Sequence, residues 1–152
     1  MTGDGMDTTE ERLTLQSRLS ELTQVPPWIE CLATRHTIPD STQFAMNLCL
    51  EEALSNVIRH GYSSKPDRSI AVQFANPREN YFVFVVEDDA PPFNPLDSPE
   101  LPALSSLDEV RVGGQGIRLI RQFSNALEYE PTPTGNRLSI GFSTANSAVA
   151  KD

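Results

Sequence analysis

The sequence predicts an α+β fold in which one mixed sheet is covered by helices on one face. Hydrophobic periodicity gives the order strand, helix, helix, strand, strand, loop, helix, strand, strand. A length of 152 residues suits one domain with a proper core, and no repeat or low-complexity tract interrupts it. We therefore expect one domain over residues 11–144, with polar tails at 1–10 and 145–152.

The first half of the chain predicts one strand and two helices. "RLTLQS", residues 12–17, alternates as a short strand does. A helix is expected over residues 26–36, because proline is tolerated in a helix's first turn. A second helix, over residues 40–60, begins with three residues that can each cap it and has Gly61 as its stop.

The second half predicts four strands and one helix. "SIAVQFA", residues 69–75, alternates, whereas "YFVFVVED", residues 81–88, is apolar on both sides and so predicts a central strand. Residues 89–112 hold five of the twelve prolines and predict an irregular loop. "GGQGIRLIRQF" opens a short helix at Gly116, and "NALEYE" and "NRLSIGFST" are two strands around the turn "PTPTGN".

Composition excludes several classes of function. The formal net charge of -9 argues against a nonspecific grip on nucleic acid or anionic lipid. Cys31 and Cys49 have no metal-like spacing and are expected to be reduced core thiols. The chain has no signal-peptide pattern at its start and no run of roughly 18 apolar residues. We expect a soluble, cytoplasmic protein with no direct nucleic-acid partner and no membrane partner.

A polar row interrupts the helix expected at residues 40–60. On a helical projection Glu52, Asn56 and Arg59 fall together on the flank of the apolar stripe. Charged residues on a helix flank are usually just solvated. The row alone therefore indicates no function.

Two further stretches change this interpretation. "VVEDDAPPFNP" places Asp88 at the end of the central strand, where side chains project into the crevice beyond the sheet. "VGGQGIRLI" places Gly113, Gly114 and Gly116 before a helix, where backbone N–H groups can converge on an anion. Each alone has a plain alternative, a proline turn for the first and an ordinary helix start for the second.

In this order and spacing the three stretches resemble the Bergerat-type, or histidine-kinase-like, ATPase superfamily, and within it the anti-sigma-factor serine/threonine kinases of bacterial partner-switching systems. "EEALSNVIRHGY" looks like the N box, "EDDAPPFNP" like the first glycine box and "GGQGIRLI" like the second. The resemblance covers roughly residues 11–143. It implies a two-layer α/β sandwich with a mixed, mostly antiparallel sheet and helices on one face.

The resemblance also implies roles for single residues. Glu52 matches the general base on the substrate hydroxyl, and Asn56 matches the asparagine that ligates Mg²⁺ at the bound ATP. Asp88 matches the aspartate that accepts a hydrogen bond from the adenine amine. Ser139 stands where the family carries a hydroxyl near the adenine, and Arg59 could offset phosphate charge.

Two more parts of the ATP site follow from the same resemblance. The proline-rich stretch 94–112 corresponds to the ATP lid. The second glycine box supplies the backbone that encloses the phosphates, here Gly113, Gly114, Gly116 and Ile117.

One position departs from the family pattern. The first glycine box has glycine two positions after its aspartate, but this chain has Ala90. The extra methyl would crowd the adenine or the water beside it, which affects nucleotide affinity more than the fold.

The function implied is an ATP- and Mg²⁺-dependent serine/threonine kinase in transcription regulation that phosphorylates an anti-sigma-factor antagonist. Sequestration of a sigma factor and a homodimer are further expectations from the resemblance. Two alternatives remain open: a nucleotide-binding regulatory module that transfers no phosphate, and a structural α/β domain without nucleotide. A sensor histidine kinase is disfavoured, because 152 residues leave no room for a phosphoacceptor helix pair.

Overall fold

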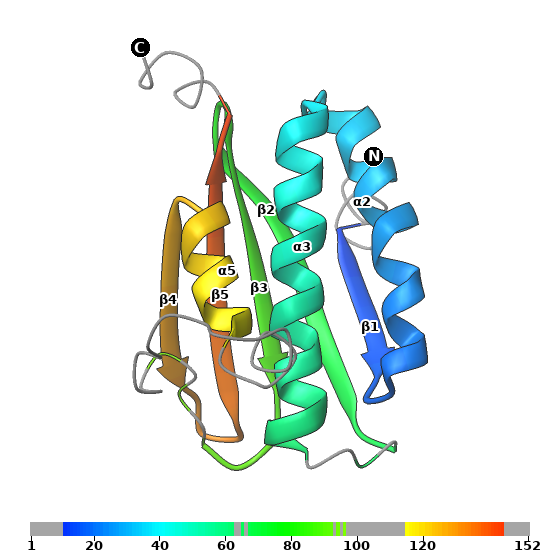
Figure 1. Ribbon diagram of the computed structural model, residues 1–152, viewed down its shortest axis with the longest axis vertical. Helices are drawn as coiled ribbons and strands as arrows, with labels where there is room; N and C mark the ends of the chain where they lie inside the picture. Colours follow the sequence, from blue (N-terminus) through cyan, green and yellow to red (C-terminus); the bar gives the residue numbers. More distant parts are fainter. Residues whose placement is uncertain are drawn as a thin grey trace, which may run out of the picture.

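The computed structural model of the chain describes residues 11–62, 65, 67–92, 94, 96 and 115–144. The expected tails lie outside the described residues, as does nearly all of the expected lid. The described part forms two layers, a sheet and a set of helices that cover one of its faces (Figure 1). The predicted α+β class is therefore confirmed.

The sheet has five strands in the order β1-β2-β3-β5-β4, and every neighbouring pair is antiparallel. The described strands thus contain no parallel pair, although we expected a mixed sheet. β3 is central, as predicted from its apolar residues on both faces. The strands are Arg12–Gln16 (β1), Ser69–Arg78 (β2), Tyr81–Asp88 (β3), Ala126–Pro131 (β4) and Asn136–Ser143 (β5).

Three α-helices lie on one face of the sheet, with α3 between α2 and α5 (Figure 1). A short 3-10 helix, which was not predicted, leads directly into α2. None of the described helices is long and apolar enough to cross a membrane. The helical segments are Leu19–Gln24 (η1), Val25–His36 (α2), Asp40–Asn56 (α3), the π-helix Val57–Gly61 (η2) and Gln115–Phe123 (α5).

The core lies between the sheet and the helices, because alternate residues of each strand point toward the helices. From the sheet it takes Leu15, Ile70, Val72, Phe74, Phe82, Phe84, Val86, Leu138, Ile140 and Phe142, all of them buried. From α3 it takes Ala45, Met46, Cys49, Leu50, Ala53 and Leu54. The predicted apolar stripe of the second helix is therefore its core face.

The second helix ends differently from the prediction. It reaches Gly61 as expected, but its last turn, from Val57, widens into a π-helix. This turn is closed by the Tyr62 backbone N–H, which donates to the Val57 carbonyl at 2.8 Å. The widened turn carries Gly61 and Tyr62 to the end of the sheet at which β3 finishes.

The two cysteines have different surroundings. Cys49 is fully buried, and burial raises the pKa of its thiol to about 12, so the thiol stays protonated. Cys31 is exposed on α2, so the expectation that it is a core thiol is wrong. Its apolar sequence neighbours lie on the opposite side of the helix, facing α3 and the sheet.

Candidate functional site

Asn56 and Asp88, which are 32 positions apart in the sequence, line one small cavity at the end of α3. We call it the inner cavity. Its volume is about 30 Å³, room for only about one or two water molecules, so a larger ligand must part its walls. It is lined by Ala53, Asn56, Val57, Gly61, Val86, Asp88, Tyr129, Asn136 and Leu138.

The Asp88 carboxylate is fixed by two donors on one oxygen. Its Oδ1 accepts from the Ala90 backbone N–H at 2.9 Å and from Asn136 Nδ2 at 2.8 Å. Burial raises the pKa of Asp88, and the neighbouring Asp89 adds to the rise, whereas the two hydrogen bonds oppose it. The site therefore presents a partly desolvated acceptor.

Asn136 and Tyr129 also line the inner cavity, and the sequence did not predict either of them as a site residue. Asn136 is directly opposite Asp88 in the β3–β5 register and is buried. Its Oδ1 accepts from the Tyr129 hydroxyl at 2.5 Å, which connects β4 to the same group. The available signal was an asparagine at the start of a strand that follows a tight turn, but its partner depends on the strand order.

Asn56 has a side chain that is open to a ligand. It is half-buried in the last turn of α3, and no hydrogen bond from the described residues engages its amide. A neutral amide oxygen is an acceptable ligand for a hard cation that also binds phosphates. The geometry therefore fits the metal-binding role expected for Asn56.

Glu52 opens toward a different hollow, on the side of α3 that faces η1 and α2. Burial raises the pKa of Glu52, the neighbouring Glu51 adds to the rise, and Arg59 opposes it. We call this hollow the acceptor groove, after the substrate hydroxyl for which Glu52 is the expected general base, and its volume is about 430 Å³. It is lined by Leu19, Leu22, Thr23, Val25, Pro26, Asn47, Glu51, Glu52, Ser55 and Arg59.

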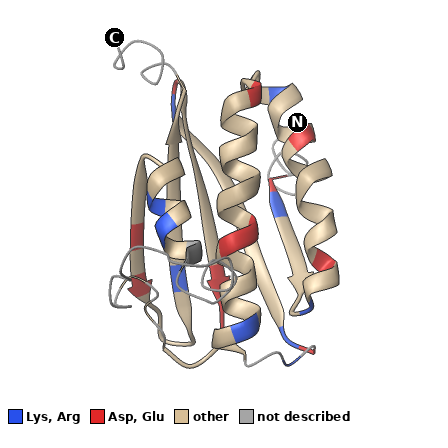
Figure 2. Cartoon of the chain, in the orientation of Figure 1, with Lys and Arg blue, Asp and Glu red and all other residues tan. Residues whose placement is uncertain are grey.

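Figure 2 shows how charge is distributed around these openings. Acidic residues colour parts of α3, β3 and β4, and basic residues colour the last turn below α3 and parts of α5 and β5. Arg59 belongs to that last turn and is exposed. Arg59 is thus a cation beside the acidic Glu51 and Glu52 of α3.

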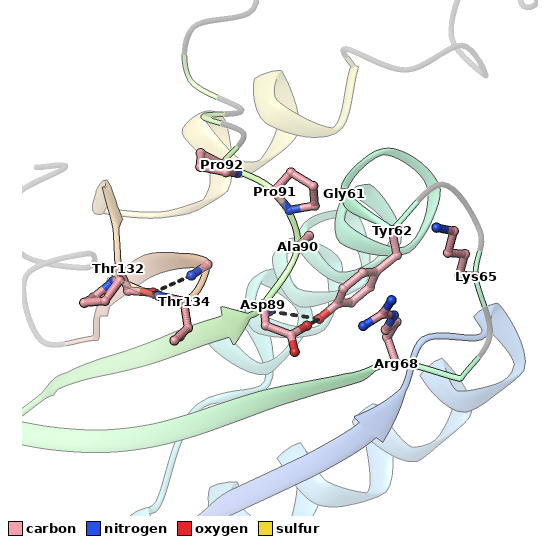
Figure 3. Close-up of a pocket in the computed structure, with 12 residues that line it drawn as sticks. Gly61, Tyr62, Lys65, Arg68, Asp89, Ala90, Pro91, Pro92, Thr132 and Thr134 are labelled. Carbon is pink, nitrogen blue, oxygen red and sulfur yellow. Dashed lines mark hydrogen bonds between the residues drawn. The ribbon is translucent and has the colours of Figure 1, made fainter.

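A third cavity, the outer cavity, has a volume of about 490 Å³ and shares Gly61 with the inner cavity (Figure 3). Its walls are the end of the π-helix with Lys65 and Arg68, the turn after β3, and the turn between β4 and β5. Tyr62 holds the turn after β3: its hydroxyl lies 2.5 Å from Asp89 Oδ1 and accepts from the Asp89 backbone N–H at 2.9 Å. The segment that follows Asp88 is therefore tethered to the helix layer.

Ala90 contacts protein rather than open space. It is 2% exposed, and a Cβ placed on Gly61 would lie 3.3 Å from the Ala90 Cβ. Gly61, which lies inside the N-box stretch, thus leaves room for the methyl that the first glycine box normally lacks. Whether this methyl alters nucleotide affinity stays a prediction.

The second glycine box is described only in part. Gly113 and Gly114 lie outside the described residues, whereas Gly116 lies in the first turn of α5. Ile117 is buried in the core, so its side chain serves packing. The first turn of α5 is the part of that helix that lies nearer to the last turn of α3 (Figure 1).

The structure does not bring Ser139 to this group. Ser139 pairs with Val85 and Glu128 on the face of the sheet that lies away from the described helices, which we call the uncovered face. Asn136, three residues earlier, points the other way and lies beside Asp88. The hydroxyl expected near the adenine is therefore not supplied by Ser139.

Sequence comparisons connect this arrangement with known proteins. The sequence profile described as the histidine kinase-like ATPase domain matches residues 15–142, most of the chain. The serine/threonine-protein kinase BtrW of Bordetella bronchiseptica is 27% identical over 143 residues, 94% of this chain and 98% of that protein.

Two solved structures share the fold. The RsbU and RsbW domains of Rv1364c from Mycobacterium tuberculosis align over 87% of this chain and 32% of that one, with a TM-score of 0.57 and 12% identity. The blue-light activated histidine kinase EL346 of Erythrobacter litoralis aligns over 74% and 33%, with a TM-score of 0.51 and 19% identity. The chain spans about a third of each, and at these identities the likeness concerns the fold alone.

Proposed function

The chain belongs to the histidine kinase-like ATPase domain family, and on this premise we propose that it is an ATP-dependent serine/threonine protein kinase. The similarity to BtrW over nearly the full length of both proteins supports a protein rather than a small molecule as phosphate acceptor. The substrate that we propose is an antagonist of an anti-sigma factor, in a cytoplasmic partner-switching system. Sigma-factor binding and a homodimer remain predictions of the same kind.

The observation that carries this proposal is that α3 separates two openings. Asn56 faces the inner cavity with Asp88, whereas Glu52, one turn earlier, faces the acceptor groove. A nucleotide and an acceptor chain can therefore approach the end of α3 from different sides. Two separate approaches suit in-line phosphoryl transfer, since the attacking and leaving oxygens lie on opposite sides of the phosphorus.

We assign base recognition to Asp88 and transfer to Glu52. Asp88 accepts a hydrogen bond from the adenine amine, and the carbonyl of guanine at that position would meet an acceptor instead. Glu52 takes the proton of the substrate serine hydroxyl while the serine oxygen bonds to the γ-phosphorus. The bond between the γ-phosphorus and the leaving ADP oxygen breaks in the same step. The raised pKa of Glu52 makes it a stronger base than an exposed glutamate.

Asn56 is the residue that would hold Mg²⁺, and Arg59 the nearest described cation to the acceptor groove. The metal, when bound, neutralises charge on the phosphates. Backbone N–H groups at Gly113, Gly114, Gly116 and Ile117 would enclose those phosphates at the start of α5.

The acceptor groove suits a segment of a folded protein partner. Leu19 and Leu22 give it apolar contacts, and Leu19 is 44% exposed, which is unusual among the leucines that the structure describes. Glu51 and Glu52 make the wall that α3 contributes to this groove acidic. A serine flanked by apolar and polar or basic residues therefore fits this groove better than an acidic segment.

The test combines nucleotide binding with phosphate transfer. Calorimetry should give ATP affinity that increases with Mg²⁺ and GTP affinity at least about tenfold weaker, because one repelled hydrogen bond in a half-buried site costs roughly 1–3 kcal/mol. Labelled ATP should then phosphorylate a serine of a purified candidate antagonist. Binding without transfer would favour the regulatory module that transfers no phosphate, and equal ATP and GTP affinities would remove Asp88 from its role.

A further inference from the structure

We propose that Asn136, held in place by Tyr129, is the positioning residue that directs Asp88 toward the adenine amine and so sets the selectivity for the base. This inference rests on the proposed function. It assigns the start of β5 and the middle of β4 to base selection, beyond the three boxes recognised in the sequence.

The two carboxylate oxygens of Asp88 differ in the hydrogen bonds that they accept. Both hydrogen bonds that the described residues give to this carboxylate fall on Oδ1, from the Ala90 N–H and from Asn136 Nδ2. A carboxylate can accept about four hydrogen bonds, two on each oxygen. Oδ2 therefore keeps its acceptor capacity for a ligand in the inner cavity.

The Asn136 amide has only one orientation that suits its neighbours. Its Nδ2 lies beside three oxygens, Asp88 Oδ1 at 2.8 Å and the carbonyls of Ala90 and Pro91, each at 3.3 Å. Its Oδ1 accepts from the Tyr129 hydroxyl. A flipped amide would place oxygen against these acceptors, so the contacts fix the donor toward Asp88.

The contacts among Asp88, Asn136 and Tyr129 are largely buried and connect the three strands β3, β5 and β4. Asn136 is 7% exposed, and Asp88 is opposite it in the register. Without the amide, Asp88 Oδ1 keeps one donor and the carboxylate can rotate. The pKa of Asp88, already raised by burial, would also rise further, because the Asn136 hydrogen bond lowers it. A rotated or protonated carboxyl distinguishes adenine from guanine poorly.

The experiment measures ADP and GDP affinities by calorimetry without metal, for the full chain. Asn136→Ala should weaken ADP binding by about tenfold or more and narrow the ADP-to-GDP ratio by at least about fivefold. Tyr129→Phe keeps the ring that lines the cavity and loses only the hydroxyl. It should weaken ADP binding by about threefold. In an Asp88→Asn background, Asn136→Ala should lower the ADP affinity further by less than about twofold, because Asn136 acts through Asp88.

Glu128→Ala is the matched control, since Glu128 is exposed, adjacent to Tyr129 in sequence and on the uncovered face of the sheet. It should leave both affinities within about twofold, the usual range for a surface change. Thermal unfolding checks each variant. If Asn136→Ala does not fold, Asn136→Ser, which keeps a smaller donor, should give intermediate selectivity.

Equal loss of ADP and GDP affinity, or the same loss in the Asp88→Asn background, would show that Asn136 only supports the fold. If the wild-type chain prefers ADP and Asn136→Ala has the same ADP-to-GDP affinity ratio, this inference is overturned and the proposed kinase function stands. A wild-type chain that binds neither nucleotide would overturn both.

Discussion

Replacing Glu52 by glutamine separates chemistry from binding at the end of α3. Glutamine has the same shape but cannot take a proton, so transfer should fall by about 10² to 10⁴, the usual worth of a general base. Glu52 lines the acceptor groove and not the inner cavity. ATP affinity should therefore stay within a few-fold of wild type.

The same substitution should not reduce stability. Burial raises the pKa of Glu52 from 4.5, so the folded state disfavours its charge. For an acid with a raised folded pKa, stability is greatest at low pH and falls as the pH rises from about 4.5 through the folded value. Glu52→Gln stays neutral, so its Tm at pH 7 should equal or exceed that of wild type. Loss of transfer then cannot be ascribed to unfolding.

The charged neighbours of Glu52 predict the pH dependence of transfer. The rate should rise with pH as Glu52 loses its proton and then level off. Arg59 lowers the pKa of Glu52 and Glu51 raises it. Arg59→Ala should therefore move the acid limb of the profile to higher pH, and Glu51→Gln should move it to lower pH.

The assay is single-turnover transfer from labelled ATP to the serine of a purified antagonist protein, over a range of pH. Glu30→Gln, an exposed glutamate on α2 outside the groove, is the control for the chemical change. If Glu52→Gln transfers phosphate at the wild-type rate, or if the acid limb does not respond to Arg59 and Glu51, Glu52 is not the base.

Two further substitutions test the binding side of the site. Asn56→Ala deletes a metal ligand, so it should abolish the increase of ATP affinity with Mg²⁺ while metal-free ADP binding changes only a few-fold. Calorimetry with and without Mg²⁺ measures both affinities. If Mg²⁺ still increases the ATP affinity of the variant, Asn56 does not hold the metal. Gly135→Ala should lower the free energy of unfolding by at least about 1–3 kcal/mol in urea titrations, because its Cβ would overlap the Asp88 carbonyl and lie 2.5 Å from the Asp89 Cα. Gly135→Ala should also weaken the binding of adenine nucleotides. If the free energy of unfolding and the nucleotide affinity both stay at their wild-type values, the turn accommodates the methyl freely.

The elements of this fold were predictable because their signals are local. Alternation in residues 69–75 and the apolar run in 81–88 lie within single strands, and the stripe of α3 within one helix. Spacing of four residues also places Glu52 and Asn56 one turn apart on α3, whatever the helix packs against. The geometry of the last turn was not predictable, because the π-helix depends on what Gly61 and Tyr62 contact.

The partners of these residues depended on the tertiary structure. Asn136 lies beside Asp88 because β5 pairs with β3 in one particular register, and a shift of one residue would have turned its side chain to the uncovered face. Ser139 was assigned to the site from its position in the sequence, but strand alternation places it on that uncovered face. Likewise, η1 and α2 give Glu52 a groove of its own, apart from the inner cavity. The sequence by itself determined which residue types carry the chemistry, because those motifs are short and local, whereas the packing of the whole sheet decided which of them meet.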